Sequence, residues 1–239
     1  MIRAIIFDFN GVIADDETPH VVCFQQALAE SGLSLTTEEY YGAYLGMDER
    51  TCTKLLLIKR DGACDAQLLE RITSRKAELF GARTANRKPE LFPGVVEFVK
   101  AAGKIHRLAI ASGGRRGQID AALAGTLIQR DFELIVAAED CPVGKPDPAI
   151  YRLTLDRLNR SGCDSIPLAP SDCLVIEDSL AGIQSAQAAG MPVLALATTY
   201  PIDKLNGANF VTENLRHVPP DTLLTALAQI GHGSRSPTP

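Results

Sequence analysis

Short, continuously apolar runs recur along the chain and alternate with amphipathic stretches. Continuous apolar runs of three to five residues are typical of strands buried on both faces of a parallel sheet. The pattern predicts strands at Ala4–Phe7, Leu108–Ala111, Leu134–Ala137, Leu174–Ile176 and Val193–Leu196. Helical periodicity predicts helices near Val95–Ala102, Gly117–Ala124, Pro148–Leu158 and Leu180–Ala189. Such alternation predicts an α/β fold with a doubly wound parallel sheet.

The segment between the first strand and the rest of the predicted sheet breaks this alternation. It holds four amphipathic stretches joined by turns that contain glycine: Pro19–Ser31, Thr37–Tyr44, Arg50–Arg60 and Ala66–Phe80. A segment of that length is too long for a loop of a compact domain. The sequence therefore predicts a helical cap domain at 16–88, inserted into a core domain of residues 1–15 and 89–231, and a disordered tail at 232–239.

Composition narrows the classes of function. The formal net charge of −5 over 239 residues gives no basic footprint for nucleic acid or an anionic membrane. The six cysteines form no C-x-x-C pair, which argues against a zinc site or a disulfide framework. No apolar run is long enough for a signal peptide or a membrane span. We expect a cytoplasmic protein, a monomer or weak dimer, that binds an anionic metabolite through local cations or a metal.

Chemically active side chains follow four of the predicted strands. In strand order these are Asp8 with Asn10, Ser112 with the turn at Gly113, Lys145, and Glu177 with Asp178. Ligands of open parallel sheets bind beyond the carboxyl ends of the strands, so we expect these groups to share one edge. Each alone could be a turn residue, a helix cap or a solvated charge. Their joint position after successive strands favours a shared site.

The combination of groups is typical of phosphoryl transfer. Clustered carboxylates repel one another unless a cation lies among them, and hard oxygen ligands suit Mg²⁺. The metal and Lys145 can neutralise a phosphate so that the anionic carboxylate of Asp8 can attack it. Ser112 and the backbone N–H groups of its Gly-rich turn can hold phosphate oxygens.

These residues resemble the signatures of the haloacid dehalogenase-like (HAD) superfamily. The usual motif D-x-D-G-[TV]-[LI] stands here as Asp8-Phe9-Asn10-Gly11-Val12-Ile13. The other three signatures match Ser112, Gly144-Lys145-Pro146 and Glu177-Asp178-Ser179-x-x-Gly182. Within the superfamily the chain most resembles the β-phosphoglucomutase-like branch. The resemblance implies a Rossmann-like core with a small helical cap.

The resemblance also implies roles for individual residues. Asp8 would be the nucleophile, and Mg²⁺ would be held by Asp8, Asp178 and the backbone carbonyl of Asn10, with Glu177 assisting directly or through water. Ser112, Gly113 and Lys145 would bind the transferring phosphate. Three residues of the predicted cap could contact the substrate, although the latter two could also be surface residues of a helix: His20, Arg50 and Lys76.

Asn10 departs from the family pattern, which has an aspartate acting as general acid and base at this position. An amide has no proton to exchange, so it cannot fill that role, although its backbone carbonyl can still bind metal. Four explanations remain open. In the first, the chain acts on good leaving groups such as acyl phosphates; in the second, Asp15, Asp16 or His20 supplies the proton. In the third, the asparagine is an introduced, substrate-trapping replacement; in the fourth, the protein is a binding or regulatory relative.

We therefore expect a Mg²⁺-dependent phosphatase acting on a small phosphorylated metabolite, a sugar phosphate in the first place. The alternatives are a phosphosugar mutase and a catalytically weakened binding protein. A haloalkanoate dehalogenase fits less well because it needs no metal, and Glu177 and Asp178 would then have no purpose. A phosphonate-cleaving enzyme would need a cap lysine, and the surroundings of Lys54 do not match that pattern.

Overall fold

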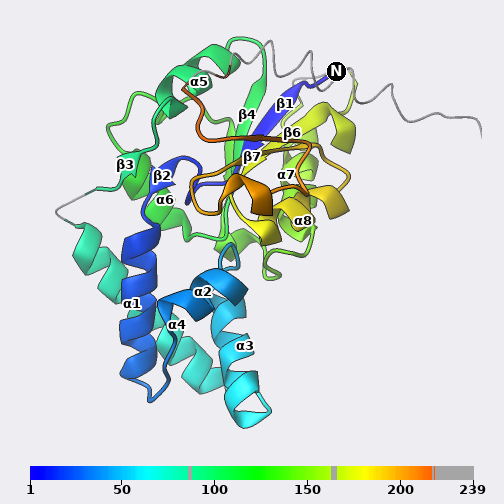
Figure 1. Ribbon diagram of the computed structural model, residues 1–239. Coiled ribbons are helices and arrows are strands. Elements are labelled where there is room, and N and C mark those ends of the chain that lie inside the picture. Colours follow the sequence, from blue (N-terminus) through cyan, green and yellow to red (C-terminus); the bar gives the residue numbers. More distant parts are fainter. Residues whose placement is uncertain (86–87, 163–165, 217, 219–239) are drawn as a thin grey trace, which may run out of the picture.

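The computed structural model describes residues 1–85, 88–162, 166–216 and 218 of the chain. Its centre is a six-stranded parallel sheet in the order β5-β4-β1-β6-β7-β8 (Figure 1). The strands are β1 (Ala4–Phe7), β4 (Arg107–Ala111), β5 (Leu134–Val136), β6 (Cys173–Glu177), β7 (Val193–Leu196) and β8 (Phe210–Thr212). The predicted α/β fold is thus confirmed, and the predicted tail lies outside the described residues.

Alternate residues of β1 face opposite sides of the sheet, because side chains of a strand alternate. Ile5 and Phe7 belong to the core shared with α5 (Val95–Ala102) and α6 (Arg116–Leu123). Ala4 and Ile6 belong to the other core, which α7 (Ala149–Arg160) and α8 (Leu180–Ala188) cover. The sheet is therefore doubly wound, and β1 is buried on both faces as its continuous apolar run predicts.

Three short strands are absent from the sequence prediction. β8 is an edge strand of three half-buried residues, too short to leave an apolar run. β2 (Ala14–Asp15) and β3 (Glu90–Leu91) form an antiparallel pair where the chain leaves the core and returns to it. Three short 3₁₀ turns complete the described elements: Ala138–Asp140, Pro170–Asp172 and Ile202–Lys204.

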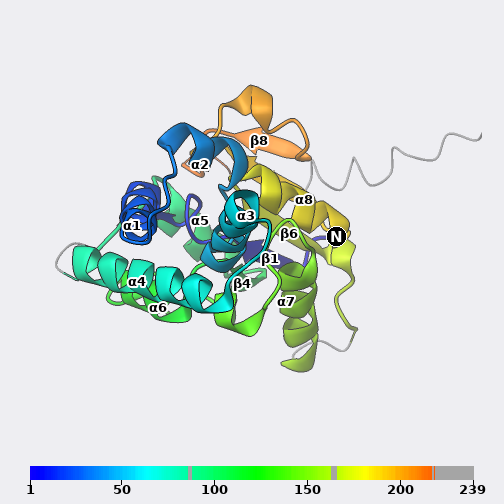
Figure 2. The same ribbon diagram turned by 90° about the horizontal axis from the view of Figure 1, so that it is seen from below.

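Four helices lie between β2 and β3, close to the predicted bounds: α1 (Glu17–Ala29), α2 (Thr37–Ala43), α3 (Glu49–Asp61) and α4 (Ala66–Thr84). Figures 1 and 2 show them gathered beside the sheet, below it in the view of Figure 1, and we call them the cap helices. They have a core of their own, to which Phe24, Leu57 and Ile72 contribute. The division into two domains stays a prediction.

The cap helices touch the core at several points. The Tyr200 hydroxyl donates a hydrogen bond to the backbone carbonyl of Tyr41 at 2.7 Å. Gly46 has φ +80°, and a Cβ there would lie 2.3 Å from Ser179 Oγ at the start of α8. Glycine at this position therefore lets the loop before α3 approach the sheet edge.

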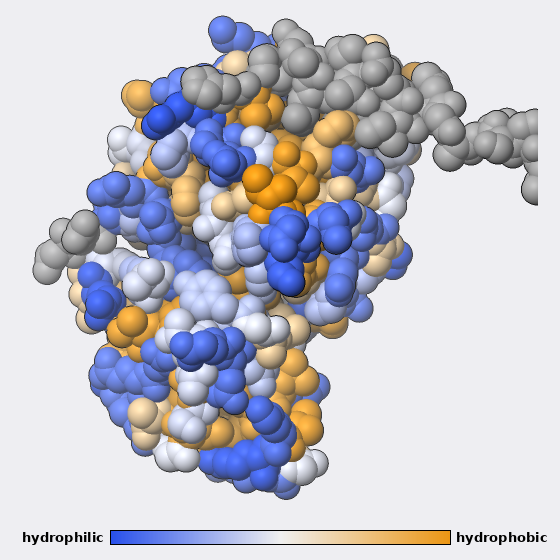
Figure 3. Space-filling model, in the orientation of Figure 1, coloured by the Kyte–Doolittle hydropathy of each residue, from blue (hydrophilic) through white to orange (hydrophobic). Residues whose placement is uncertain are grey.

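On the face seen in Figure 3, hydrophilic side chains cover much of both the core and the cap helices, with apolar patches between them. Among the described residues, no helix combines the length and apolarity that crossing a membrane requires.

Candidate active site

Asp8 lies directly beyond the carboxyl end of β1, where it is almost fully buried. Its backbone N–H continues the sheet by donating to the carbonyl of Ile176 at 2.9 Å, which fixes the residue beside β6. The loop that follows turns at Gly11, whose φ is +77° and where a Cβ would lie 2.0 Å from Asp178 Oδ2. Glycine here therefore allows both the turn and the close approach of the Asp8 loop to Asp178.

Lys145 supplies a buried cation to this edge. Its Nζ lies 2.9 Å from Asp8 Oδ1 and 2.6 Å from Glu177 Oε1. Burial opposes the charged ammonium, but the carboxylates of Asp8 and Glu177 outweigh it and raise the pKa of Lys145 above its usual value. The ammonium thus stays charged and links two strand ends.

Glu177 is fully buried, and both of its carboxylate oxygens are engaged within the protein. Oε1 accepts hydrogen bonds from Lys145 and from the Tyr151 hydroxyl at 2.8 Å. Oε2 accepts from the backbone N–H groups of Asp178 and Ser179 and from the Ser179 hydroxyl, each at 3.0 Å. Although burial raises the pKa of Glu177, Lys145 and these hydrogen bonds lower it below its usual value. Glu177 therefore stays ionised and orients Lys145.

Asp8, Glu177 and Asp178 form a cluster that fits a divalent cation. Each offers one carboxylate oxygen, and the three oxygens lie within 4.8 Å of one another. Burial and the neighbouring carboxylates of Glu177 and Asp8 raise the pKa of Asp178 well above its usual value. Asp8 Oδ1 is buried without a hydrogen bond of good geometry. Since Glu177 is already saturated, Asp8 and Asp178 are the more available ligands.

The pKa of Asp8 predicts how metal binding should depend on pH. Burial raises it from 3.8 to about 7, with Glu177 adding to the rise and Lys145 opposing it. A carboxyl group with a raised folded-state pKa stabilises the fold below pH 4 and loses that contribution as the pH approaches 7. Mg²⁺ binds the ionised form, so we expect the Mg²⁺-induced rise in Tm to be larger at pH 8 than at pH 5. Thermal unfolding in EDTA and in saturating Mg²⁺ measures this.

The control for this prediction is Asp178→Asn, which removes the charge of the second ligand and should shrink the rise in Tm at pH 8. A rise in Tm at pH 5 as large as that at pH 8 in the unaltered protein would contradict the proposed role of the carboxylates as ligands.

Ser112 lies beyond the end of β4 and is buried. Its hydroxyl accepts a hydrogen bond from the Gly114 N–H at 3.0 Å and donates to Asn10 Oδ1 at 3.3 Å. The turn therefore presents a hydroxyl and backbone N–H groups beside the Asp8 loop, which is the arrangement expected for holding phosphate oxygens.

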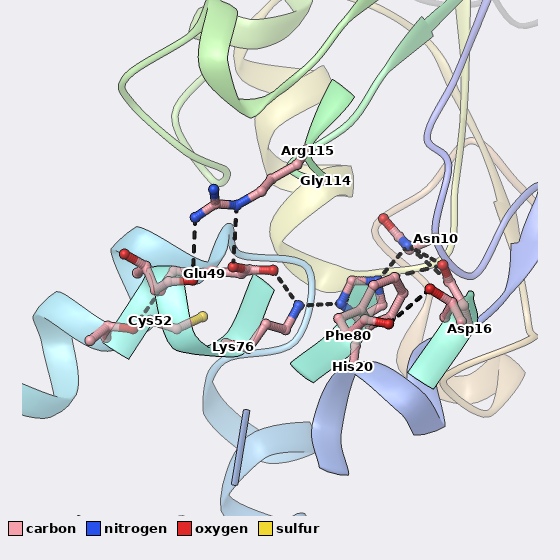
Figure 4. Close-up of polar contacts among 12 residues, drawn as sticks. Asn10, Asp16, His20, Glu49, Cys52, Lys76, Phe80, Gly114 and Arg115 are labelled. Atoms are coloured by element: carbon pink, nitrogen blue, oxygen red, sulfur yellow. Dashed lines mark hydrogen bonds and ion pairs between the residues drawn. The ribbon is translucent and has the colours of Figure 1, made fainter. Parts of the chain in front are cut away.

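The side-chain amide of Asn10 is engaged at both ends. Its Nδ2 lies 2.8 Å and 2.9 Å from the two carboxylate oxygens of Asp16 and 3.1 Å from His20 Nε2 (Figure 4). Asp16 is itself buried. The group at position 10 is thus held by a carboxylate six residues further along the chain.

A chain of contacts continues from Asn10 through the cap helices. Lys76 Nζ donates to His20 Nδ1 at 2.5 Å and forms an ion pair with Glu49. Glu49 Oε2 in turn lies 3.8 Å from Arg115 Nε, which belongs to the core (Figure 4). Lys76 is almost fully buried, so the interpretation of this lysine as a surface residue is wrong.

The predicted site residues are brought together, with one exception. A cavity of about 60 Å³ lies between the sheet edge and the cap helices. Predicted residues line it or, like Lys145, contact those that do: Asp8, Asn10, His20, Lys76, Ser112, Gly113 and Asp178. Arg50 instead lines a neighbouring cavity beside Glu70, with its Nη1 2.9 Å from Glu70 Oε2. The structure adds Glu17, Tyr40 and Glu49 to the lining.

Known proteins similar to this chain agree with the architecture. A model of the haloacid dehalogenase-like hydrolases matches residues 2–190. Protein CbbY of Rhodobacter capsulatus is 32% identical over 83% of this chain and 87% of its own length. A phosphorylated carbohydrates phosphatase of Thermotoga maritima is 30% identical over 79% of this chain and 82% of its own length.

Solved structures show the same fold. A β-phosphoglucomutase of Clostridium difficile has a TM-score of 0.82 at 20% identity, covering 96% of this chain and 99% of that one. An aspartate-to-asparagine mutant of CbbY from Rhodobacter sphaeroides, in complex with xylulose 1,5-bisphosphate, has a TM-score of 0.75 at 26% identity, covering 91% of this chain and 96% of that one. These matches confirm the resemblance found in the sequence: the chain belongs to the haloacid dehalogenase-like hydrolases, among relatives named as phosphatases.

Proposed function

We propose that the protein is a Mg²⁺-dependent phosphatase that transfers the phosphoryl group of a small phosphorylated carbohydrate to Asp8 and then to water. The observation that carries this proposal is the buried arrangement of Asp8 beside Lys145 and Asp178 at the edge of the cavity. The phosphorylated carbohydrates phosphatase and the CbbY complex with a sugar bisphosphate support the choice of substrate class.

In the first step a carboxylate oxygen of Asp8 attacks phosphorus, and the bond between phosphorus and the ester oxygen breaks. The electron pair of that bond goes to the leaving oxygen, which takes up a proton from solvent water because Asn10 has none to give. The ammonium of Lys145 neutralises charge on the phosphoryl oxygens, because it lies 2.9 Å from Asp8 Oδ1. In this proposal the hydroxyl of Ser112 holds another phosphoryl oxygen, which is supported by its position beside the Asp8 loop, where it contacts Asn10.

Mg²⁺ would be held by Asp8, Asp178 and the backbone carbonyl of Asn10, with Glu177 behind them. The bound cation supplies charge neutralisation for the phosphoryl group and allows two buried carboxylates to stay ionised together. Glu177 acts on the site mainly by fixing Lys145 and the start of α8, since its two oxygens already accept hydrogen bonds from those groups.

In the second step water attacks the phosphorus of the aspartyl phosphate, the bond to Asp8 breaks, and phosphate leaves. Both steps benefit from a group that exchanges a proton at the leaving or attacking oxygen. Asn10 cannot do so, and its Nδ2 already donates hydrogen bonds to the carboxylate of Asp16. General acid–base assistance contributes roughly 10²–10⁴ in rate, so turnover of unactivated esters should be slow by about that factor.

The cap helices choose the leaving group in this proposal, and residues 16–88 act as a cap domain. Ligand pockets commonly hold roughly 300–1,000 Å³, much more than the cavity of about 60 Å³. A sugar phosphate therefore enters only when the cap helices move away from the sheet edge. The contacts that must separate include those at Tyr200 and Gly46 and those of Arg115 with Glu49 and Thr73.

Dependence on Mg²⁺ is the first test. Incubation with a panel of phosphate esters in Mg²⁺ should release inorganic phosphate, and the rate should fall by more than about 10²-fold in EDTA and recover when Mg²⁺ is restored. Acetyl phosphate should turn over faster than hexose 6-phosphates, because its leaving group needs no proton. Phosphate release and ester consumption are both measured.

Other outcomes separate the alternatives. Conversion of a hexose 1-phosphate to its 6-phosphate without release of phosphate would replace hydrolysis by mutase activity. Tight binding of esters in Mg²⁺ without consumption of any of them would indicate a binding protein.

A further inference from the structure

The wall of the cavity that the cap helices form has an unusual balance of charge for an enzyme that binds phosphate esters. Its charged residues and its histidine on the cap helices are Glu17, Glu49, Lys76 and His20, and the lining also includes the neutral Tyr40 and Cys52. Lys76 is the only lysine or arginine among the described residues that line this cavity. The side that would receive the leaving group is therefore acidic unless Lys76 is free to act.

Lys76 is not free. Its ammonium is paired with Glu49 and donates to His20 Nδ1, and it lies 5.0 Å from the centre of the Phe80 ring. Only about 1% of the residue is exposed. A lysine held in this way by a carboxylate, an imidazole and an aromatic face has little capacity left for an anionic group of a substrate.

Each glutamate still has an oxygen to offer. Glu49 Oε2 is buried, has no hydrogen-bond partner, and has Arg115 Nε at 3.8 Å as its nearest charged neighbour. Glu17 Oε1 accepts from the Tyr40 hydroxyl at 2.7 Å, and no hydrogen bond to its second oxygen is found among the described residues. Burial raises the pKa of Glu17, while His20 and the Tyr40 hydroxyl oppose that rise. In its ionised form each carboxylate accepts hydrogen bonds and cannot donate them, so these oxygens need a ligand with O–H or N–H groups.

The arginines nearby do not change this balance. Arg50 is paired with Glu70 outside the cavity, and Arg115 Nη2 donates to the backbone carbonyl of Thr73 at 3.3 Å. Both line a neighbouring cavity together with Asp48 and Glu49. No described side chain thus presents an unpaired cation toward the leaving group.

From this arrangement we infer that the substrate is a monophosphate whose leaving group is rich in O–H or N–H donors and carries no second anionic group. A polyol and an amino-polyol share this chemistry. A second phosphate would face Glu17 and Glu49 with no free cation to bind it, and juxtaposed like charges oppose binding. This inference rests on the proposed function, and it separates the chain from the CbbY solved with xylulose 1,5-bisphosphate.

The test compares matched esters in Mg²⁺: glucose 6-phosphate, glucosamine 6-phosphate and glucose 1,6-bisphosphate. We expect kcat/KM for each monophosphate to exceed that for the bisphosphate by at least about tenfold. If glucosamine 6-phosphate exceeds glucose 6-phosphate, the glutamates recognise an ammonium group; if not, they recognise hydroxyls. Glu49→Gln should raise the ratio of bisphosphate to monophosphate by about tenfold, because it removes a negative charge and frees Lys76.

Glu78→Gln is the control, because it removes the charge of an exposed glutamate of α4 that pairs with Arg75 and lines neither cavity, and it should leave the ratio unchanged. Calorimetric binding of the same three esters to the Asp8→Asn protein in Mg²⁺ repeats the comparison without turnover. A bisphosphate processed or bound as well as the monophosphates would overturn the inference and leave the phosphatase proposal standing. Preferential binding of monophosphates with no hydrolysis of any ester would do the reverse.

Discussion

Replacement of Asp8 by alanine is expected to reduce phosphate release by more than about 10³-fold on every ester, because neither of the other two carboxylates in its cluster can take its place as nucleophile. Glu177 has both oxygens engaged, and Asp178 is packed against Gly11. Phosphate release in Mg²⁺ and trapping of the phosphorylated protein with labelled acetyl phosphate measure the loss. Retention of more than a tenth of the activity would rule out Asp8 as the nucleophile.

The same variant should not lose stability, and this result distinguishes a carboxylate that serves as nucleophile from one that stabilises the fold. In the metal-free protein at pH 8 the ionised Asp8 carboxylate is unfavourably buried, as its pKa of about 7 indicates. Its removal leaves Lys145 paired with Glu177. We therefore expect the Tm of Asp8→Ala in EDTA at pH 8 to equal or exceed that of the unaltered protein.

Lys145→Met is the matched comparison. It removes the cation that contacts both Asp8 and Glu177, and leaves these two buried carboxylates without an ion-pair partner among the described residues. Removing one member of a buried ion pair commonly costs about 3–5 kcal/mol. This variant should therefore lose both activity and stability, and Mg²⁺ should restore only part of the stability.

Much of the site could be predicted because the topology of the sheet alone brings its residues together. The carboxyl ends of parallel strands lie at one edge of the sheet, so residues at or directly after the ends of β1, β4 and β6 must lie near one another whatever the rest of the chain does. To predict that Asp8, Ser112 and Glu177 lie together, only the strand ends have to be located, and the buried apolar runs indicate those ends.

The cap side could not be predicted in the same way. Arg50 was expected to meet substrate, whereas its neighbour Glu49 lines the cavity. Consecutive residues of a helix point about 100° apart. Which side of α3 faces the cavity therefore decides whether the glutamate or the arginine next to it lines the site. Facing is set by how α3 packs against the other cap helices, and the sequence of α3 alone does not contain that information. Burial of Lys76 depends on the same packing.

The contact of Asn10 with Asp16 depends neither on strand ends nor on which side of a helix faces the cavity, but on how a loop folds back. Asp16 was one of three candidates for a proton donor, on proximity in sequence alone. The loop between them, closed by the Gly11 N–H donating to the Ala14 carbonyl at 3.0 Å, brings the Asp16 carboxylate back to the Asn10 amide. A carboxylate and an amide thus stand side by side at the sheet edge.

That pairing changes what Asn10→Asp should do. Installing a carboxyl group at position 10 restores the family pattern and should raise kcat on phosphate monoesters by roughly 10²–10⁴. However, the new carboxylate would face Asp16 at the place where Asn10 now donates two hydrogen bonds of 2.8 Å and 2.9 Å. Two adjacent carboxylates repel one another or share a proton, which should hold the single variant to a small part of that gain.

The double variant Asn10→Asp with Asp16→Asn exchanges the two groups and keeps the hydrogen bond with its direction reversed. We expect its kcat to exceed that of Asn10→Asp by about tenfold, since the amide at position 16 can then donate to the carboxylate at position 10. Asp15→Asn, at an exposed neighbouring position, is the control and should add nothing to Asn10→Asp. If neither the single nor the double variant exceeds the unaltered protein on its best ester, proton exchange at the leaving oxygen does not limit turnover, and the slow step lies in the opening of the cap helices.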